Sequence, residues 1–215
     1  MKVIIIPVTP FAQNCTILIC QQTNKAAVID PGGDIDKIAA QLRNEGATLD
    51  KILLTHAHLD HVGGTIELAK LFNVDVVGPH KDDEFWLDML PQQAQMFNFP
   101  PASVFKPNKW LAHNDTVSFG AVTLDVLHCP GHTPGHVVFY HSSSKLLIVG
   151  DVLFKGSIGR TDFPKGDHAT LIASIKNNLF SLPDDVTFLP GHGPQSTLGH
   201  EKQTNPYLQQ STHFG

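Results

Sequence analysis

Residues 55–64 of the chain read THAHLDHVGG and follow the short apolar run Ile52–Leu54. Three imidazoles and one carboxylate stand within six residues here, and both groups are ligands of divalent transition metals. A catalytic metal site needs several such groups to converge while one coordination position stays open. The stretch therefore predicts a metal-binding loop at the carboxyl end of a strand. The alternative is a polar surface loop that happens to be rich in histidine.

Other metal-ligand residue types stand directly after apolar runs elsewhere in the chain. Asp30 and Asp151 each end such a run, and His132 and His192 each close a Pro-Gly-His turn at residues 130–132 and 190–192. Glycine allows the backbone to bend there, and proline restricts the approach to the turn. In layered α/β folds, ligand sites gather outside the carboxyl ends of strands. Together with residues 56–61 these positions indicate one shared site.

The spacing of apolar residues predicts alternating strands and helices. The expected strands cover residues 2–6, 15–20, 26–30, 52–55, 74–77, 117–119, 122–127, 137–140, 146–149 and 186–189. The expected helices run from an N-cap at Asp34 to Gly46 and over residues 65–72, 80–90, 167–180 and 199–209. Two similar halves, each a sheet with helices outside, are expected to form one domain over residues 1–215. The proline- and phenylalanine-rich residues 91–109 predict an irregular segment, either the wall of a substrate pocket or a packed connection.

Composition narrows the class of protein. The 215 residues carry a formal net charge of −5, which argues against a nucleic-acid partner because such partners require a basic face. Thirteen histidines are an excess typical of metal sites. No signal peptide and no membrane-spanning run is recognisable, and the three cysteines are too few for a disulfide framework, so a cytoplasmic protein is expected. Cys129 is expected to pack as a buried thiol rather than to act as a nucleophile.

The pattern His56-x-His58-x-Asp60-His61, with Gly-His132, Gly-Asp151 and Gly-His192 later, resembles the metallo-β-lactamase superfamily over nearly the whole chain. Within it the chain resembles the glyoxalase II group, the hydroxyacylglutathione hydrolases, and most nearly their short bacterial type. The segments DDEFW at 82–86, GHTPGH at 131–136 and GHGP at 191–194 carry this closer likeness. The resemblance implies an α/β fold, the four-layer αββα sandwich, with the site at one edge of the two sheets.

The resemblance also implies two divalent metal ions per chain, zinc first and iron or manganese as alternatives. The first ion would be held by His56, His58 and His132, the second by Asp60, His61 and His192, and Asp151 would bridge them. Asp60 is further expected to act in catalysis by orienting a hydroxide shared by the two ions. Asp30, Thr55 and His136 are expected to support ligands, with His136 structural rather than a ligand.

The implied reaction is hydrolysis of S-D-lactoylglutathione, or a related hydroxyacylglutathione, to D-lactate and glutathione. The shared hydroxide would attack the acyl carbon, and a thiolate with a pKa of about 8.5 would leave without a dedicated general acid. Arg160 stands where the family places a basic residue against glutathione, so it is the predicted substrate-binding residue. The alternative for Arg160 is a solvated arginine.

Three other functions remain open at this point. The segment GRTDF at 159–163 resembles the corresponding loop of persulfide dioxygenases, iron enzymes of the same superfamily. A β-lactamase or an RNA-processing nuclease is disfavoured by the lack of an export signal and by the acidic charge. A non-catalytic binding module is disfavoured because the ligand set is complete.

Overall fold

The first half of the chain forms a five-stranded sheet in the order β1-β2-β3-β4-β5. This computed structural model describes residues 1–209. The strands are β1 Lys2–Val8, β2 Gln13–Ile19, β3 Lys25–Ile29, β4 Thr48–Leu53 and β5 Asp75–Val77. β1, β2 and β3 pair antiparallel, whereas β3, β4 and β5 pair parallel. The carboxyl ends of β3, β4 and β5 therefore lie at the same edge.

The second half forms a six-stranded sheet in the order β13-β12-β9-β8-β7-β6. The strands are β6 Thr116–Phe119, β7 Val122–His128, β8 Val137–His141, β9 Leu146–Gly150, β12 Thr187–Pro190 and β13 Ser196–Thr197. β7 and β8, and β8 and β9, pair antiparallel, and β9 pairs parallel with β12. It follows that β7, β9 and β12 all point the same way. A separate hairpin joins β10 Leu153–Phe154 to β11 Ser157–Ile158.

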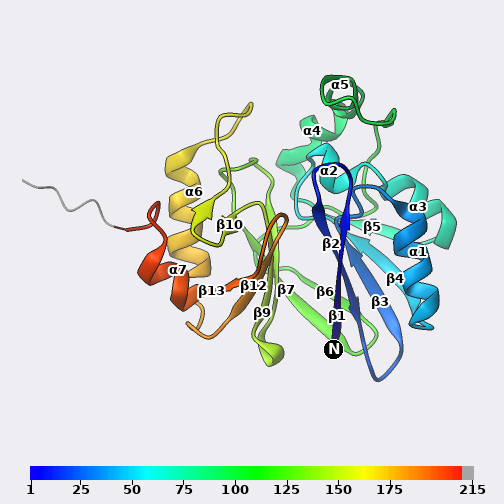
Figure 1. The fold of residues 1–215 in the computed structure, drawn as a ribbon, viewed down its shortest axis with the longest axis horizontal. Coiled ribbons are helices and arrows are strands. Elements are labelled where there is room, and N and C mark those ends of the chain that lie inside the picture. The colour runs from blue at the N-terminus through cyan, green and yellow to red at the C-terminus, as the bar shows by residue number, and fades with distance from the viewer. Residues whose placement is uncertain (210–215) are drawn as a thin grey trace, which may run out of the picture.

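Helices cover the outer faces of both sheets (Figure 1). α1 Ile35–Asn44 and α3 Thr65–Phe72 lie outside the first sheet, and α6 His168–Ser174 and α7 Leu198–Thr204 outside the second. The short helices α2 Leu59–Val62, α4 Glu84–Asp88 and α5 Leu90–Met96 gather at one end of the sheets. Short 3₁₀ helices cover Lys81–Asp83 and Ser142–Ser144, and a π-helix covers Ile175–Leu179. The predicted α/β fold with four αββα layers is confirmed.

Alternation along the strands produces the layers. In β3, Ala26 and Val28 face the core under α1 and α3, while Ala27 and Ile29 face the second sheet. In β8, Val138 points to the core under α6 and Phe139 points between the sheets. Successive side chains of a strand point to opposite faces, so a strand that is apolar throughout is buried on both faces. Both sheets are therefore covered from either side.

Both predicted ends of α1 are in place, but only the carboxyl-terminal one makes the expected capping hydrogen bond. Asp34 occupies the N-cap position, but its side chain makes no capping bond and instead accepts the Thr9 N–H at 2.9 Å. At the other end Gly46 adopts φ +60, and its N–H reaches the Arg43 carbonyl at 3.0 Å. This left-handed glycine satisfies a carbonyl that the helix leaves unpaired, as predicted.

Several predicted elements differ from the structure. Residues 91–109 were expected to be irregular, yet α5 begins at Leu90, because a proline in the first helical turn costs no hydrogen bond and Pro91 stands there. Residues 80–90 form a 3₁₀ turn and the short α4 instead of one helix. The expected helix 199–209 ends at Thr204, and residues 210–215 lie outside the described range. Within residues 1–209, no helix combines the length and the apolar character needed to cross a membrane.

Candidate metal centre

The residues predicted to form one site do lie together, and the directions of the strands explain why. Asp30 follows β3 and residues 55–61 follow β4, while His132, Asp151 and His192 follow β7, β9 and β12. Within each sheet these strands run the same way, so their carboxyl ends share an edge. The site forms where the two edges meet.

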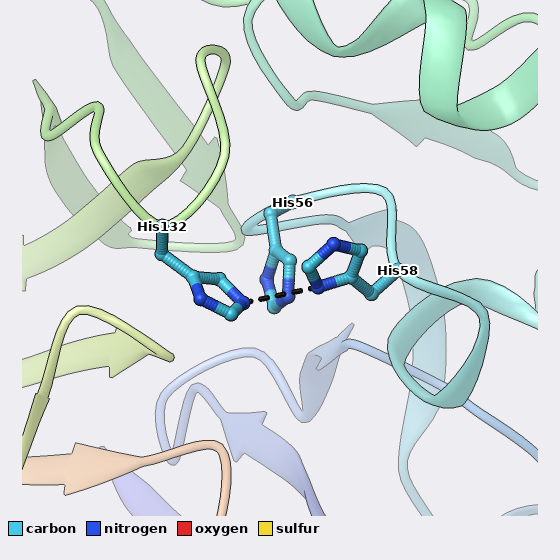
Figure 2. A group of neighbouring side chains, drawn as sticks. All are labelled: His56, His58 and His132. Carbon is cyan, nitrogen blue, oxygen red and sulfur yellow. Dashed lines mark hydrogen bonds between the residues drawn. The ribbon is translucent and has the colours of Figure 1, made fainter. Parts of the chain in front are cut away.

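Three imidazoles form the first cluster, drawn in Figure 2. The backbone at His58 is extended, so His56 and His58 project to the same side of the loop. Nδ1 of His58 lies 3.0 Å from Nε2 of His132, and the His56 ring lies 4.8 and 4.9 Å from the other two rings between centroids. All three side chains are buried.

The second cluster consists of Asp60, His61 and His192. α2, a helical turn that the sequence did not predict, places Asp60 and His61 on successive residues pointing to this cluster. Oδ2 of Asp60 lies 3.0 Å from Nε2 of His192 and 3.7 Å from Nε2 of His61. Of these two clusters, the second is the one that includes a carboxylate of its own.

Asp151 lies between the two clusters. Its Oδ1 is 3.4 Å from Nε2 of His61, and its Oδ2 is 3.8 Å from Nε2 of His132 and 3.7 Å from Nε2 of His192. The two oxygens of this one carboxylate therefore face nitrogens of both clusters. This is the placement that a bridging ligand requires.

The donor atoms fit divalent metal ions. Among the described residues, Nε2 of His56, Nε2 of His61 and Oδ1 of Asp151 are buried without any hydrogen-bond partner. Buried polar atoms rarely lack a partner, so three in one site point to a ligand that they share. Zn–N distances of about 2.0–2.1 Å would set two tetrahedral ligand nitrogens about 3.4 Å apart, close to the separations found here. The two clusters suggest a dimetal site, and nitrogen and oxygen donors together suit zinc, iron and manganese alike.

Hydrogen bonds at Nδ1 orient the ligand histidines. Nδ1 of His61 donates to Oδ2 of Asp30 at 2.9 Å, and Nδ1 of His56 donates to Oγ1 of Thr55 at 3.0 Å. The Thr55 hydroxyl in turn donates to Asp30 at 2.6 Å. A proton on Nδ1 leaves the Nε2 lone pair free for a metal. Asp30 and Thr55 therefore stand in the supporting positions expected of them.

Two main-chain carbonyls orient the two histidines that follow strands of the second sheet. Nδ1 of His132 donates to the Arg160 carbonyl at 2.7 Å, and Nδ1 of His192 donates to the Phe11 carbonyl at 3.2 Å. Sequence reasoning could not find these partners, because every residue has a carbonyl. Arg160 consequently has a backbone contact to the site in addition to its side chain.

Asp83 is a buried residue of the site that sequence reasoning missed. Its carboxylate accepts the N–H of Ala57 at 2.9 Å, the N–H of Gly135 at 2.6 Å and the hydroxyl of Thr133 at 2.9 Å. It thus ties the loop of His56 and His58 to the loop of His132. Burial raises the pKa of Asp83 to about 7, against the lowering effect of these three donors. The DDEFW segment was the only signal, and it assigned no role.

The side-chain amides of Asn14 and Gln93 hold two loops of the site in place. The Asn14 side chain donates to the carbonyls of Pro190 at 3.0 Å and Gly193 at 2.9 Å, which fixes the turn that carries His192. The Gln93 side chain accepts the Leu59 N–H at 3.0 Å and so holds the start of α2. Neither residue stands in a recognisable motif.

Gly191 is required by a close approach. A Cβ atom there would lie 2.2 Å from Oδ1 of Asp151 and 2.5 Å from Cε1 of His61. Gly131, in the matching turn, adopts φ +133, which L side chains rarely adopt, and a Cβ atom there would lie 2.4 Å from the Leu171 backbone. Both Pro-Gly-His turns thus need glycine because of a close approach, and the first also because of its backbone conformation.

His136 and Cys129 have structural positions. The His136 ring stacks on His56 with centroids 4.5 Å apart, and its Nε2 accepts the Asp151 N–H at 3.1 Å. Cys129 is buried, which raises the pKa of its thiol to about 12. A thiol of that pKa is not a nucleophile at neutral pH. Both placements match the predictions for these residues.

Burial and mutual contact set the charges of the site. Burial holds the pKa of His56 and His58 well below its usual range, which keeps both imidazoles neutral, as metal ligands must be. Burial raises the pKa of Asp60 and Asp151, but the neighbouring His61 outweighs it and both carboxyls stay below their usual range. Burial lowers the pKa of His61 and His192, but the neighbouring Asp151 and Asp60 outweigh it and raise both above the usual range, so these two imidazoles must release a proton before they can bind a metal.

A pocket of about 720 Å³ opens above the two clusters. Arg160 lines it, and its guanidinium makes two bonds of 2.7 Å to the Asp162 carboxylate and lies 4.0 Å from the Phe163 ring centroid. The predicted substrate-binding residue is therefore at the pocket, but its charge is paired. Met96 and Phe97 also line the pocket. Of the two expectations for residues 91–109, the one that placed the segment at a pocket wall is therefore confirmed.

Comparison with known proteins agrees with this geometry. The sequence profile of the metallo-beta-lactamase superfamily matches residues 8–192. The chain belongs to the metallo-beta-lactamase superfamily. Hydroxyacylglutathione hydrolase GloC of Haemophilus influenzae is 43% identical over 209 residues, which are 97% of this chain and 98% of that protein. This relative confirms the resemblance to the hydroxyacylglutathione hydrolase group and the assignment of the chain to metal-dependent hydrolases.

Two solved structures share both the fold and a third of the sequence. The BLEG-1 B3 metallo-beta-lactamase superposes with a TM-score of 0.89 at 37% identity, covering 96% of this chain and 99% of its own. TTHA1623 in a di-iron-bound form superposes with a TM-score of 0.87 at 36% identity, covering 95% and 100%. Metal centres of this fold thus include di-iron centres.

Proposed function

We propose that the chain is a metal-dependent thioester hydrolase of the glyoxalase II type, acting on S-D-lactoylglutathione or a related hydroxyacylglutathione. The observation that carries the proposal is the pair of clusters sharing Asp151 at the floor of a pocket. The 43% identity to a hydroxyacylglutathione hydrolase over 97% of the chain supports the choice of substrate.

His56, His58 and His132 would hold one ion, Asp60, His61 and His192 the other, and Asp151 both. When bound, two such ions lower the pKa of a water towards neutrality and polarise the thioester carbonyl. Hydrolysis adds that water across the C–S bond: its oxygen joins the acyl carbon, and sulfur leaves with the bonding electrons and takes up a proton. Asp60 lines the pocket with an oxygen directed at the second cluster, so its role is to orient the attacking water.

Arg160 is proposed to bind the glutathione arm. A guanidinium at the pocket wall recognises a carboxylate, and glutathione carries two. The adjacent Asp162 carboxylate matches the ammonium of the same substrate. The chemistry is thereby assigned to the buried floor and the choice of thiol to the exposed Arg160–Asp162 pair.

The test is turnover of S-D-lactoylglutathione by chain reconstituted separately with zinc, iron and manganese, with metal content measured in parallel. We expect thioester cleavage and about two ions per chain. Oxygen consumption is followed in parallel samples that contain glutathione persulfide, the substrate of the alternative persulfide dioxygenase. Oxygen uptake without thioester cleavage would replace the proposal by that alternative.

A further inference from the structure

The pocket above the clusters has two unlike walls. One is here called the α5 wall. It consists of Trp86 in α4, Met96 in α5, and the residues that directly follow these helices, Met89 and Phe97. The other, the Arg160 wall, consists of Ile158, Arg160 and Phe163. Phe11, from the turn between β1 and β2, extends the α5 wall at its rim.

Charge distinguishes the two walls. Arg160 is the single lysine or arginine among the residues that line the pocket, and its wall adjoins the α5 wall where the Phe163 ring lies 6.2 Å from the Trp86 ring between centroids. The α5 wall has no ionisable side chain, and the polar Gln93 beside it is committed to the N–H of Leu59 and the carbonyl of Trp86. Gln92 of α5 also lines the pocket but is uncharged, so an ionic group of a substrate finds no opposite charge on the α5 wall and would lose part of its hydration there.

The α5 wall begins directly beside the reacting centre. The Trp86 ring lies 4.6 Å from the ring of His58, between centroids, and the Phe11 carbonyl is bonded to His192. A carbonyl held at the two clusters therefore has this wall as its immediate neighbour. One of the two arms of a thioester must lie along it.

Three apolar side chains at the mouth of the pocket are exposed. Met96 is 74% exposed, Phe11 45% and Phe97 38%, and the rings of Phe11 and Phe97 touch edge to face at 5.9 Å. Contiguous exposed apolar groups at the mouth of a pocket mark a ligand site. Methionine adapts to ligands of different shape because its side chain is flexible and polarisable.

We propose that the α5 wall is an acyl subsite that selects thioesters with a bulky apolar acyl group, aromatic or branched aliphatic, over the methyl of a lactoyl group. This inference rests on the proposed function. The thiol arm of a hydroxyacylglutathione carries two carboxylates and an ammonium, so it lies towards Arg160. The acyl arm then lies along the α5 wall, where a phenyl ring in place of a methyl group buries more apolar surface.

The test compares S-D-mandeloylglutathione with S-D-lactoylglutathione, which share the thiol and the 2-hydroxyl group. We expect kcat/KM of the metal-loaded chain to be about tenfold higher for the mandeloyl thioester. The double variant Met96→Gln/Phe97→Gln should lose about that factor on mandeloyl and less than about twofold on lactoyl, since both side chains are exposed and the floor is untouched. Leu71→Gln, at an exposed apolar residue of α3 that does not line the pocket, is the matched control and should leave both rates unchanged.

The outcomes separate the two proposals. Equal rates for the two thioesters, or an equal loss on both in the double variant, would overturn the acyl subsite while leaving thioester hydrolysis in place. No cleavage of either thioester by metal-loaded chain would overturn the proposed function and the subsite with it. A tenfold preference that the double variant abolishes would establish the subsite.

Discussion

The floor of the pocket and its walls differ in how their side chains are held. His56 and His61 on the floor are fully buried, and each has its Nδ1 bound to a neighbouring side chain. Met96 on the α5 wall is 74% exposed. The floor pre-organises donor atoms for one kind of chemistry, whereas the walls can change without disturbing it. In this fold the reaction and the choice of substrate are therefore separable by mutation.

The largest effect should follow loss of a ligand on the floor. His132→Ala removes an imidazole from the first cluster, so we expect kcat/KM for the thioester to fall by more than about 100-fold, beyond the range for residues that only support a ligand. Metal content should fall in the same samples. His200→Ala, at an exposed histidine of α7, should match the wild-type chain. A His132→Ala chain with unchanged turnover would show that the assigned site is wrong.

A smaller effect should follow loss of a supporting carboxylate, and it should differ between the two clusters. Asp83→Asn leaves a donor facing the N–H of Ala57 or Gly135 and should weaken binding of the first ion by about 10–100-fold. Asp30→Asn leaves an amide donor facing either the Thr55 N–H or Nδ1 of His61, and should weaken chiefly the second ion by a similar factor. The first ion should be weakened less, because Asp30 reaches His56 only through the Thr55 hydroxyl.

Calorimetric titration of zinc into metal-free chain resolves the two binding steps. Asp83 supports the first cluster and Asp30 chiefly the second if each variant weakens a different step more strongly. Both variants weakening the same step equally would contradict the assignment of Asp83 to the first cluster.

The smallest effect is expected on the Arg160 wall. Arg160→Ala removes an exposed charge that is already paired with Asp162, so KM should rise by about fivefold while kcat stays within about twofold. Asp162→Ala removes the proposed partner of the substrate ammonium and should also raise KM. Steady-state kinetics with one thioester measure both. A loss confined to kcat would place Arg160 in the reaction rather than in substrate binding.

The predictable part of the site was the part encoded by residue type at strand ends. Asp151 and His192 could be found because an apolar run precedes each and imidazole and carboxylate have a limited chemistry. Asp83 could not, because its partners at Ala57 and Gly135 are backbone N–H groups, which leave no trace in the sequence. Its role depends on two loops that the fold brings together.

The fold, too, could be predicted from the sequence only in part. Strands and long helices followed from apolar spacing, and both sheets were expected. α5 was missed because the proline- and phenylalanine-rich composition of residues 91–109 predicted an irregular segment, although Pro91 stands in the first helical turn, where its missing N–H costs nothing. α2 was missed because its four residues are too short to show a helical period.

The position of Asp151 between ligands of both sheets has a thermodynamic consequence. His56 and His61 come from the first sheet, His132 and His192 from the second, so ions bound by all of them join the two halves of the sandwich. The unfolded chain cannot assemble these donors, and free metal at 100 times its dissociation constant then adds about 2.7 kcal/mol to the free energy of unfolding. The apparent melting temperature of the protein should accordingly report metal occupancy. The reaction centre is at the same time a cross-link whose strength is set by the supply of metal.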